Sequence, residues 1–101
     1  MDKFEIVITS KAQSDLSECV QFVLNTSLEA AKKLADDLYS SIESLTTFPE
    51  RYPVFEMPKS FPYIIRKQIV NNRYIILYLV EENKVIIYRI LDARKNLNSL
   101  I

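Results

Sequence analysis

Residues 63–91, YIIRKQIVNNRYIILYLVEENKVIIYRIL, decide the fold of this chain. β-branched and aromatic residues fill the stretch, and polar clusters interrupt it at residues 71–72 and 81–83. Apolar runs separated by such short breaks predict three antiparallel strands joined by tight turns, with two-residue loops at 71–72 and 82–83. The chain has no glycine, so we expect positive φ angles at the asparagines of its turns and helix ends: Asn25, Asn71, Asn72 and Asn83.

The two loops fix the register of the strands and thereby the face on which each side chain lies. The predicted cross-strand pairs are Arg66 with Leu77, Val80 with Val85, Tyr78 with Ile87, and Ile76 with Arg89. One face of the sheet would then carry Ile64, Arg66, Gln68, Val70, Arg73, Ile75, Leu77, Leu79, Ile86, Tyr88 and Ile90.

Both faces of this predicted sheet are mostly apolar. Two helices, each about 10 Å wide, can cover only one of them. The other face would expose roughly several hundred Å² of apolar surface, which is more than a soluble monomer usually shows. We therefore expect the face with Arg66 and Arg73 to be a docking surface, covered by a partner chain or by a second copy.

The first half of the chain predicts a strand and a helical hairpin. Apolar and polar residues alternate over residues 3–9, which favours a half-buried strand. A helix should open at Ser10, with Ser10 and Gln13 as a capping box, and end near Asn25. Ser27 should cap a second helix, whose apolar seam is Leu28, Ala31, Ala35, Leu38, Ile42 and Leu45. All four prolines fall in residues 48–62, which predicts an irregular connection to the sheet.

Composition limits the classes of function. The 101 residues suit a single domain spanning 1–101, and no apolar run reaches the ~18 residues of a membrane span. With no histidine and one cysteine, Cys19, the chain lacks an internal disulfide and the common zinc sites. We expect a cytoplasmic protein without metal or cofactor, in which Cys19 is a buried small hydrophobe.

The charges are segregated along the chain, although the net charge is zero. Residues 1–50 carry four basic and nine acidic side chains, and residues 51–101 carry nine basic and four acidic ones. Such a dipolar surface can steer a partner, but a neutral protein is poorly suited to binding many phosphates.

Four segments occur in a characteristic order: EIVITSKAQSDL, EAAKKLADDLYSSIESL, FPERYP and RKQIVNNRYIILYLVEENKVIIYRILDARKN. In this order they resemble the RelE/ParE toxin superfamily of bacterial type II toxin–antitoxin systems. The resemblance covers nearly the whole chain and implies an α+β fold. An N-terminal strand and an antiparallel helix hairpin would precede a three-stranded antiparallel meander, forming one sheet with the helices on one face. It also implies a growth-inhibiting toxin, of the kind linked to plasmid stabilisation, that a cognate antitoxin neutralises.

The superfamily has two main activities. RelE-like members cleave mRNA on the ribosome with a cluster of basic side chains, whereas ParE-like members act on DNA gyrase and are not nucleases. Arg66 and Arg94 match basic positions of the RelE-like members, but Gln68 and Ile75 stand where cations are expected. Each lost donor lowers such a rate by roughly 10²–10³. The resemblance therefore favours a ParE-like, gyrase-directed or diverged toxin over a RelE-like nuclease.

Three hypotheses with named residues follow. For a toxin held by its antitoxin and acting on gyrase or the ribosome, the predicted contacts are Arg66, Arg73, Ile75, Leu77, Tyr88, Arg94 and Lys95. For a ribosome-dependent endonuclease, the cationic set would be Arg66, Arg73 and Arg94. The third hypothesis is a non-toxic interaction module or a homodimer, so both homo-oligomers and toxin–antitoxin hetero-oligomers stay open.

Two further expectations concern single side chains. Arg89 should form an ion pair with an acidic helix residue, because it falls on the helix-covered face. Tyr63, Tyr74 and Tyr78 should be core residues whose hydroxyls lie at the rim.

Overall fold

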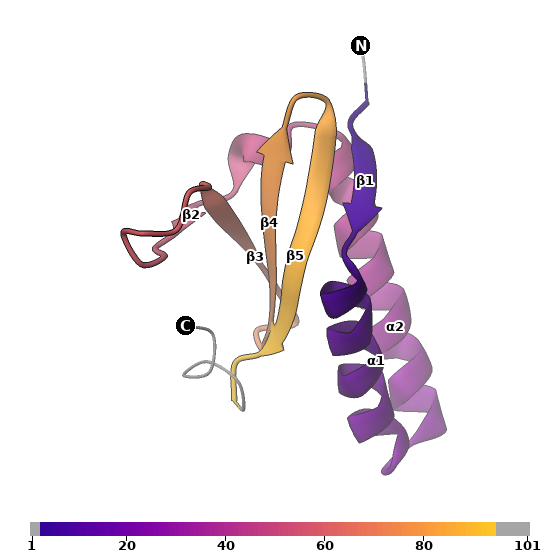
Figure 1. The fold of residues 1–101 in the computed structure, drawn as a ribbon. Coiled ribbons are helices and arrows are strands. Elements are labelled where there is room, and N and C mark those ends of the chain that lie inside the picture. The colour runs from indigo at the N-terminus through magenta and orange to yellow at the C-terminus, as the bar shows by residue number, and fades with distance from the viewer. Residues whose placement is uncertain (1–2, 95–101) are drawn as a thin grey trace.

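The fold is that of a computed structural model, which describes residues 3–94. Two helices pack on a five-stranded sheet with strand order β1-β5-β4-β3-β2, in which β1 runs parallel to β5 and the other neighbours are antiparallel (Figure 1). The elements are β1 (Glu5–Ile8), α1 (Ser10–Leu24), α2 (Leu28–Glu43), η1 (Ser44–Thr46), η2 (Pro49–Arg51), β2 (Val54–Phe55), β3 (Ile65–Val70), β4 (Tyr74–Glu81) and β5 (Lys84–Asp92). The predicted α+β fold is confirmed, and β2 is an additional edge strand. None of the helices within residues 3–94 has the length and apolar character that crossing a membrane requires.

The first helix is capped by Thr9, so the predicted capping box of Ser10 and Gln13 was wrong. Thr9 keeps the extended backbone of β1, and its hydroxyl accepts from the Ala12 N–H at 3.0 Å. The same hydroxyl donates to the Ile87 carbonyl at 3.0 Å, which joins the helix start to β5. The side-chain amide of Gln13 instead donates to the hydroxyl of Tyr39 on α2.

The other predicted helix ends are confirmed. Asn25 is the C-cap of α1, although its backbone is right-handed, and the Ser27 hydroxyl caps α2 by accepting from Ala30. The predicted seam is wrong at Leu28, which is 61% exposed because the tip of the hairpin extends past the end of the sheet (Figure 1). Leu34, absent from the predicted seam, is buried instead.

The larger apolar core lies between the helices and one face of the sheet. Its buried members are Ala12, Leu16, Leu34, Leu38, Ile42, Leu45, Val70, Tyr74, Ile76, Tyr78, Val85, Ile87 and Ile90. Alternate residues of β4 face this core, which explains why the strand is almost continuously apolar: its other residues face a second core described below.

The first hairpin closes one residue later than predicted. Asn71 and Asn72 have φ angles of 54° and 59°, and the Arg73 N–H donates to the Val70 carbonyl at 3.1 Å. The ladder then resumes with Val70 opposite Tyr74, so Arg73 is an extra residue between the turn and β4.

This shift reverses the predicted faces of β3 relative to β4. Arg66 lies opposite Tyr78 rather than Leu77. Because neighbouring side chains alternate, Arg66 shares the helix-facing side of β3 with Val70, and Ile65 belongs to the second core. The prediction that Arg66 lies on a face away from the helices was therefore wrong.

The second hairpin agrees with the prediction near its loop and departs from it farther away. The pairs Val80 with Val85 and Tyr78 with Ile87 are confirmed. A register shift beside Leu77 and Tyr78 then places Ile76 opposite Ile90, not opposite the predicted Arg89.

Positive φ angles fall only partly on the predicted asparagines. Within residues 3–94 the residues with positive φ are Phe48, Asn71, Asn72 and Glu82. Asn25 and Asn83 do not adopt such angles, so these two predictions were wrong. At 82–83 the loop reverses the chain with its first residue in the left-handed region, and that residue is glutamate.

We predict that Glu82→Gly stabilises the protein by about 0.5–1 kcal/mol, because glycine adopts positive φ without the Cβ clash of glutamate. Chemical denaturation would measure the change. Asn83→Gly is the matched control, and it should leave stability unchanged or lower it. Equal stabilisation by both variants would contradict the explanation.

Candidate functional site

Arg66, a predicted contact residue, is bound within the chain. Its Nη1 donates to the Tyr52 carbonyl at 2.8 Å. Two residues further on, buried Gln68 donates from Nε2 to the Tyr52 hydroxyl at 3.3 Å. Both side chains therefore attach β3 to the segment that follows η2.

Arg73 forms a bidentate ion pair with Asp92 at the end of β5. Its Nε lies 3.1 Å from Oδ1, and its Nη2 lies 2.8 Å from Oδ2 of a buried carboxylate. This hydrogen bonding raises the pKa of Arg73 above its ordinary value. The Arg73 carbonyl also accepts from the Ala93 N–H at 2.8 Å, and Asp92 Oδ1 accepts from the Arg94 N–H at 3.0 Å. The pair thus fixes the direction in which the chain leaves β5.

The predicted cationic set is Arg66, Arg73 and Arg94, and only part of it is free to bind a ligand. The first two guanidinium groups bind the chain itself, as described above. Arg94 is exposed, and Lys95 lies outside the described residues. A guanidinium that already binds a carboxylate or a carbonyl is less able to stabilise the negative charge of a transition-state phosphate.

Arg89 forms the ion pair that we predicted with an acidic helix residue. Its Nε lies 2.7 Å from Oδ2 of Asp15 on α1, and the same oxygen accepts from the buried Ile90 N–H at 3.1 Å. Hydrogen bonding to Asp15 raises the pKa of Arg89. This contact ties α1 to β5 beyond the end of β1.

We predict that Asp15→Ala destabilises the fold by about 3–5 kcal/mol, because it leaves the guanidinium of Arg89 and a buried N–H without their partner. Thermal and urea denaturation would measure the loss. Asp36→Ala, at an exposed position of α2, should stay within about 0.5 kcal/mol of the parent protein. A similar small effect of both substitutions would contradict the role of the pair.

The predicted docking face is covered by the chain itself, so the expectation of an open apolar face was wrong. Leu77 is 0% exposed, Ile75 is buried and Tyr88 is half-buried. The residues of this second core are Ile65, Ile75, Leu77, Leu79 and Leu91, with Phe55, Met57, Phe61, Ile86, Tyr88 and Ala93 packed against them.

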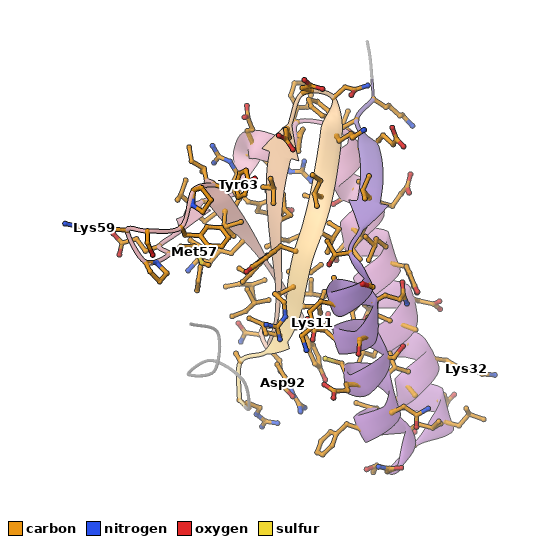
Figure 2. All side chains as sticks on the ribbon, in the orientation of Figure 1. Lys11, Lys32, Met57, Lys59, Tyr63 and Asp92 are labelled. Carbon is orange, nitrogen blue, oxygen red and sulfur yellow. The ribbon has the colours of Figure 1, made fainter. Side chains whose placement is uncertain are left out.

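The covering residues come from β2 and from the proline-rich connection between β2 and β3. The Phe61 ring packs edge-on against Tyr88, with centroids 5.6 Å apart, and against Tyr63. Figure 2 shows Met57 and Tyr63 on this connection, away from the helices, while Lys59 points outward from its tip. The spacing of apolar residues at 55, 57, 61 and 63 was the sequence signal for this cover.

The three tyrosines differ from the expectation in two respects. Tyr78 is fully buried, and its hydroxyl donates to the Pro49 carbonyl at 2.6 Å instead of reaching the rim. Burial raises the pKa of Tyr78 to about 12. Tyr74 is buried as predicted, whereas Tyr63 is exposed.

A groove of about 690 Å³ runs along α1 beside the end of β5. Its lining includes Asp15, Glu18, Cys19, Ile90 and Asp92. Two of these carboxylates already bind arginines, and burial, followed by the charges of Asp92 and Asp15, raises the pKa of Cys19 to about 11. The thiol is therefore protonated at neutral pH, although Cys19 is half-buried and not fully buried as predicted. Within residues 3–94, no group of three or more histidines, cysteines or acidic residues could hold a metal ion.

We predict that iodoacetamide alkylates Cys19 at pH 8 about 100-fold more slowly in the folded protein than in urea. The ratio follows from the pKa, which rises from 9.0 to about 11 on folding. Mass spectrometry of timed samples would give both rates. Comparable rates would show a thiol that is reactive in the native state.

The family model described as the ParE toxin of the type II toxin–antitoxin system parDE matches residues 6–97. A solved structure described as the chromosomal ParDE toxin–antitoxin system from P. aeruginosa is similar, with a TM-score of 0.70 and 20% identity over 89% of this chain and 96% of that chain.

A second similar structure is the conserved hypothetical protein HP0894 from Helicobacter pylori. Its TM-score is 0.54 and its identity 14%, over 90% of this chain and 96% of that chain. At these identities both structures show a shared fold. No curated protein matches the chain.

Proposed function

Because this chain belongs to the ParE toxin family of type II toxin–antitoxin systems, we propose that its target is DNA gyrase and not ribosome-bound mRNA. The toxin's partner is a cognate antitoxin, and an action on gyrase would take place in the cytoplasm. The observation that carries the choice of target is the internal use of Arg66 and Arg73.

Phosphodiester cleavage of the RelE-like kind relies on several cations that stabilise developing negative charge. Here Asp92 neutralises Arg73, and Arg66 is held by a carbonyl on the helix-facing side of β3. Ile75, at the position of a further expected cation, is buried in the second core. A nuclease would have to break the Arg73–Asp92 pair to free a guanidinium, and the buried carboxylate of Asp92 would then lose its bidentate cationic partner.

The covered second face also bears on the homodimer hypothesis. A second copy was expected because an apolar sheet face would otherwise be exposed, but Met57 and Phe61 already lie over that face. The reason for a homodimer is thereby removed. Of the predicted contact residues, Arg94 is exposed and is the strongest candidate for contact with the antitoxin or gyrase, while Lys95 lies outside the described residues and stays a prediction.

We predict that the purified protein inhibits DNA supercoiling by gyrase and that it does not cleave mRNA in a cell-free translation reaction. Adding the product of the neighbouring antitoxin gene should restore supercoiling. Agarose gels of plasmid topoisomers and primer extension on the mRNA would measure the two activities.

Arg94→Ala serves as the control that separates the two hypotheses, because Arg94 belongs to the candidate set for both. In a gyrase-directed toxin this variant should weaken the inhibition of supercoiling without any effect on mRNA. Ribosome-dependent cleavage that Arg94→Ala abolishes would instead establish the nuclease. Normal growth and normal supercoiling together would support a non-toxic interaction module.

A further inference from the structure

Arg94 differs from the other arginines of this chain in the part of it that is bound. The guanidinium groups of Arg51, Arg66, Arg73 and Arg89 all bind acceptors of their own chain. Arg94 is exposed, and within the described part of the chain its guanidinium makes no hydrogen bond or ion pair, whereas its backbone N–H is bound. The side chain is therefore free to bind a partner while the backbone that carries it is fixed.

One carboxylate oxygen fixes this backbone at the end of β5, where Figure 2 shows Asp92. Asp92 Oδ1 accepts from the Arg94 N–H at 3.0 Å and from Nε of Arg73 at 3.1 Å. A side chain that accepts from the N–H two residues later closes a local turn, for which aspartate and asparagine are favoured. The backbone position of Arg94 thus depends on Asp92.

Arg73 in turn fixes Asp92. Its Nη2 lies 2.8 Å from Oδ2 of the carboxylate, and Asp92 is only 4% exposed. The Arg73 carbonyl accepts from the Ala93 N–H at 2.8 Å, and the Arg73 N–H donates to the Val70 carbonyl across the first hairpin turn. The N–H groups of Ala93 and Arg94 therefore both donate to the two residues of one ion pair.

A guanidinium on a fixed backbone suits recognition of a carboxylate on a protein partner. Guanidinium groups bind carboxylates through paired, charge-assisted hydrogen bonds. Ordering the backbone of one residue on binding would lower affinity by about 5–30-fold, and a backbone that is already ordered avoids this cost.

We propose that Arg73 and Asp92 are positioning residues for Arg94, and that they hold it so that its guanidinium meets a carboxylate on the protein that this toxin binds. The proposal rests on the proposed function, in which Arg94 contacts gyrase or the antitoxin. It gives the Arg73–Asp92 pair a role in recognition besides its role in stability. Because it concerns how Arg94 is held, the complex in which Arg94 acts is an outcome of the test.

The test compares two substitutions of Asp92 that both remove the charge of the ion pair. Asp92→Asn keeps an Oδ1 acceptor for the Arg94 N–H, whereas Asp92→Ala removes it. Inhibition of supercoiling by gyrase and calorimetric affinity for the antitoxin are both expressed per folded protein. In each assay that Arg94→Ala weakens, Asp92→Ala should cause a loss of about 5–30-fold and Asp92→Asn a loss below about threefold. Hydrogen exchange at the Arg94 N–H should be accelerated by Asp92→Ala and much less by Asp92→Asn.

A double-mutant cycle separates positioning from stability. In the Arg94→Ala background, Asp92→Ala should change the same binding by less than about twofold, because the side chain that it positions is already absent. The shift that Asp92→Ala causes in the midpoint of urea denaturation should be the same in both backgrounds.

A second variant serves if Asp92→Ala does not fold. In Arg73→Leu/Asp92→Leu apolar side chains replace the ion pair, a change that often preserves stability, and the acceptor for the Arg94 N–H is absent. This variant should bind as weakly as is expected of Asp92→Ala. Asp15→Ala is the matched control, because it breaks another buried carboxylate–arginine pair, that with Arg89. It should bind like the parent protein per folded molecule.

Parent-like binding by Asp92→Ala, or by the double leucine variant, would overturn the proposal, and so would equal losses in Asp92→Asn and Asp92→Ala. Additive losses in the cycle, or a loss of the same size in Asp15→Ala, would show that the pair acts through stability alone. If Arg94→Ala weakens neither assay, Arg94 is not a contact and the proposal fails. A parent protein that does not inhibit gyrase would overturn the proposed target alone, since antitoxin affinity would still decide whether Asp92 positions Arg94.

Discussion

The register of β3 against β4 is the constraint on which the rest of the structure depends. Arg73 is left out of the ladder, so Val70 pairs with Tyr74 and the side chains of β3 are set one position from a simple two-residue hairpin. Because side chains alternate, this single residue directs Arg66 toward Tyr52. It also leaves the Arg73 carbonyl free to accept from the Ala93 N–H, just after β5, and brings the Arg73 guanidinium to Asp92.

The same register makes the second core possible. It places Ile65 beside Leu77 on the face away from the helices, where β2 and the proline-rich connection can fold over them. Prolines limit regular pairing in this connection, and β2 is accordingly only two residues long. The chain covers both apolar faces of its sheet by different means, with helices on one and an irregular segment on the other. A partner must therefore recognise features that stay exposed after this packing.

Periodicity predicted α1, α2 and every strand except β2, because these elements depend on local sequence. The resemblance to the toxin superfamily supplied the α+β arrangement. An ion pair between Arg89 and an acidic helix residue was also predicted, and the structure identifies Asp15 as the partner. The docking face did not follow, because it depends on single-residue register changes at Arg73 and beside Leu77. A slip of one residue moves a whole strand's side chains to the opposite face, so a small local error became a large error about the surface. The Thr9 cap was missed for a similar reason: its hydroxyl is fixed by β5, far along the chain.

The arginine side chains of this protein stabilise its fold, and this use limits the functions that they can serve. Arg51, Arg66, Arg73 and Arg89 all bind acceptors of their own chain, and three of them join elements that are distant in sequence. If one of these guanidinium groups turned to bind a phosphate, the acceptor that it now binds would lose its hydrogen bond. Binding a polyanion would therefore lower the stability of the fold. Arg51 is used in the same way, since it donates to the carbonyls of Ser44, Thr47 and Phe48 in its own segment. Arg66 and Arg73 therefore hold the fold together in place of forming a free cationic surface.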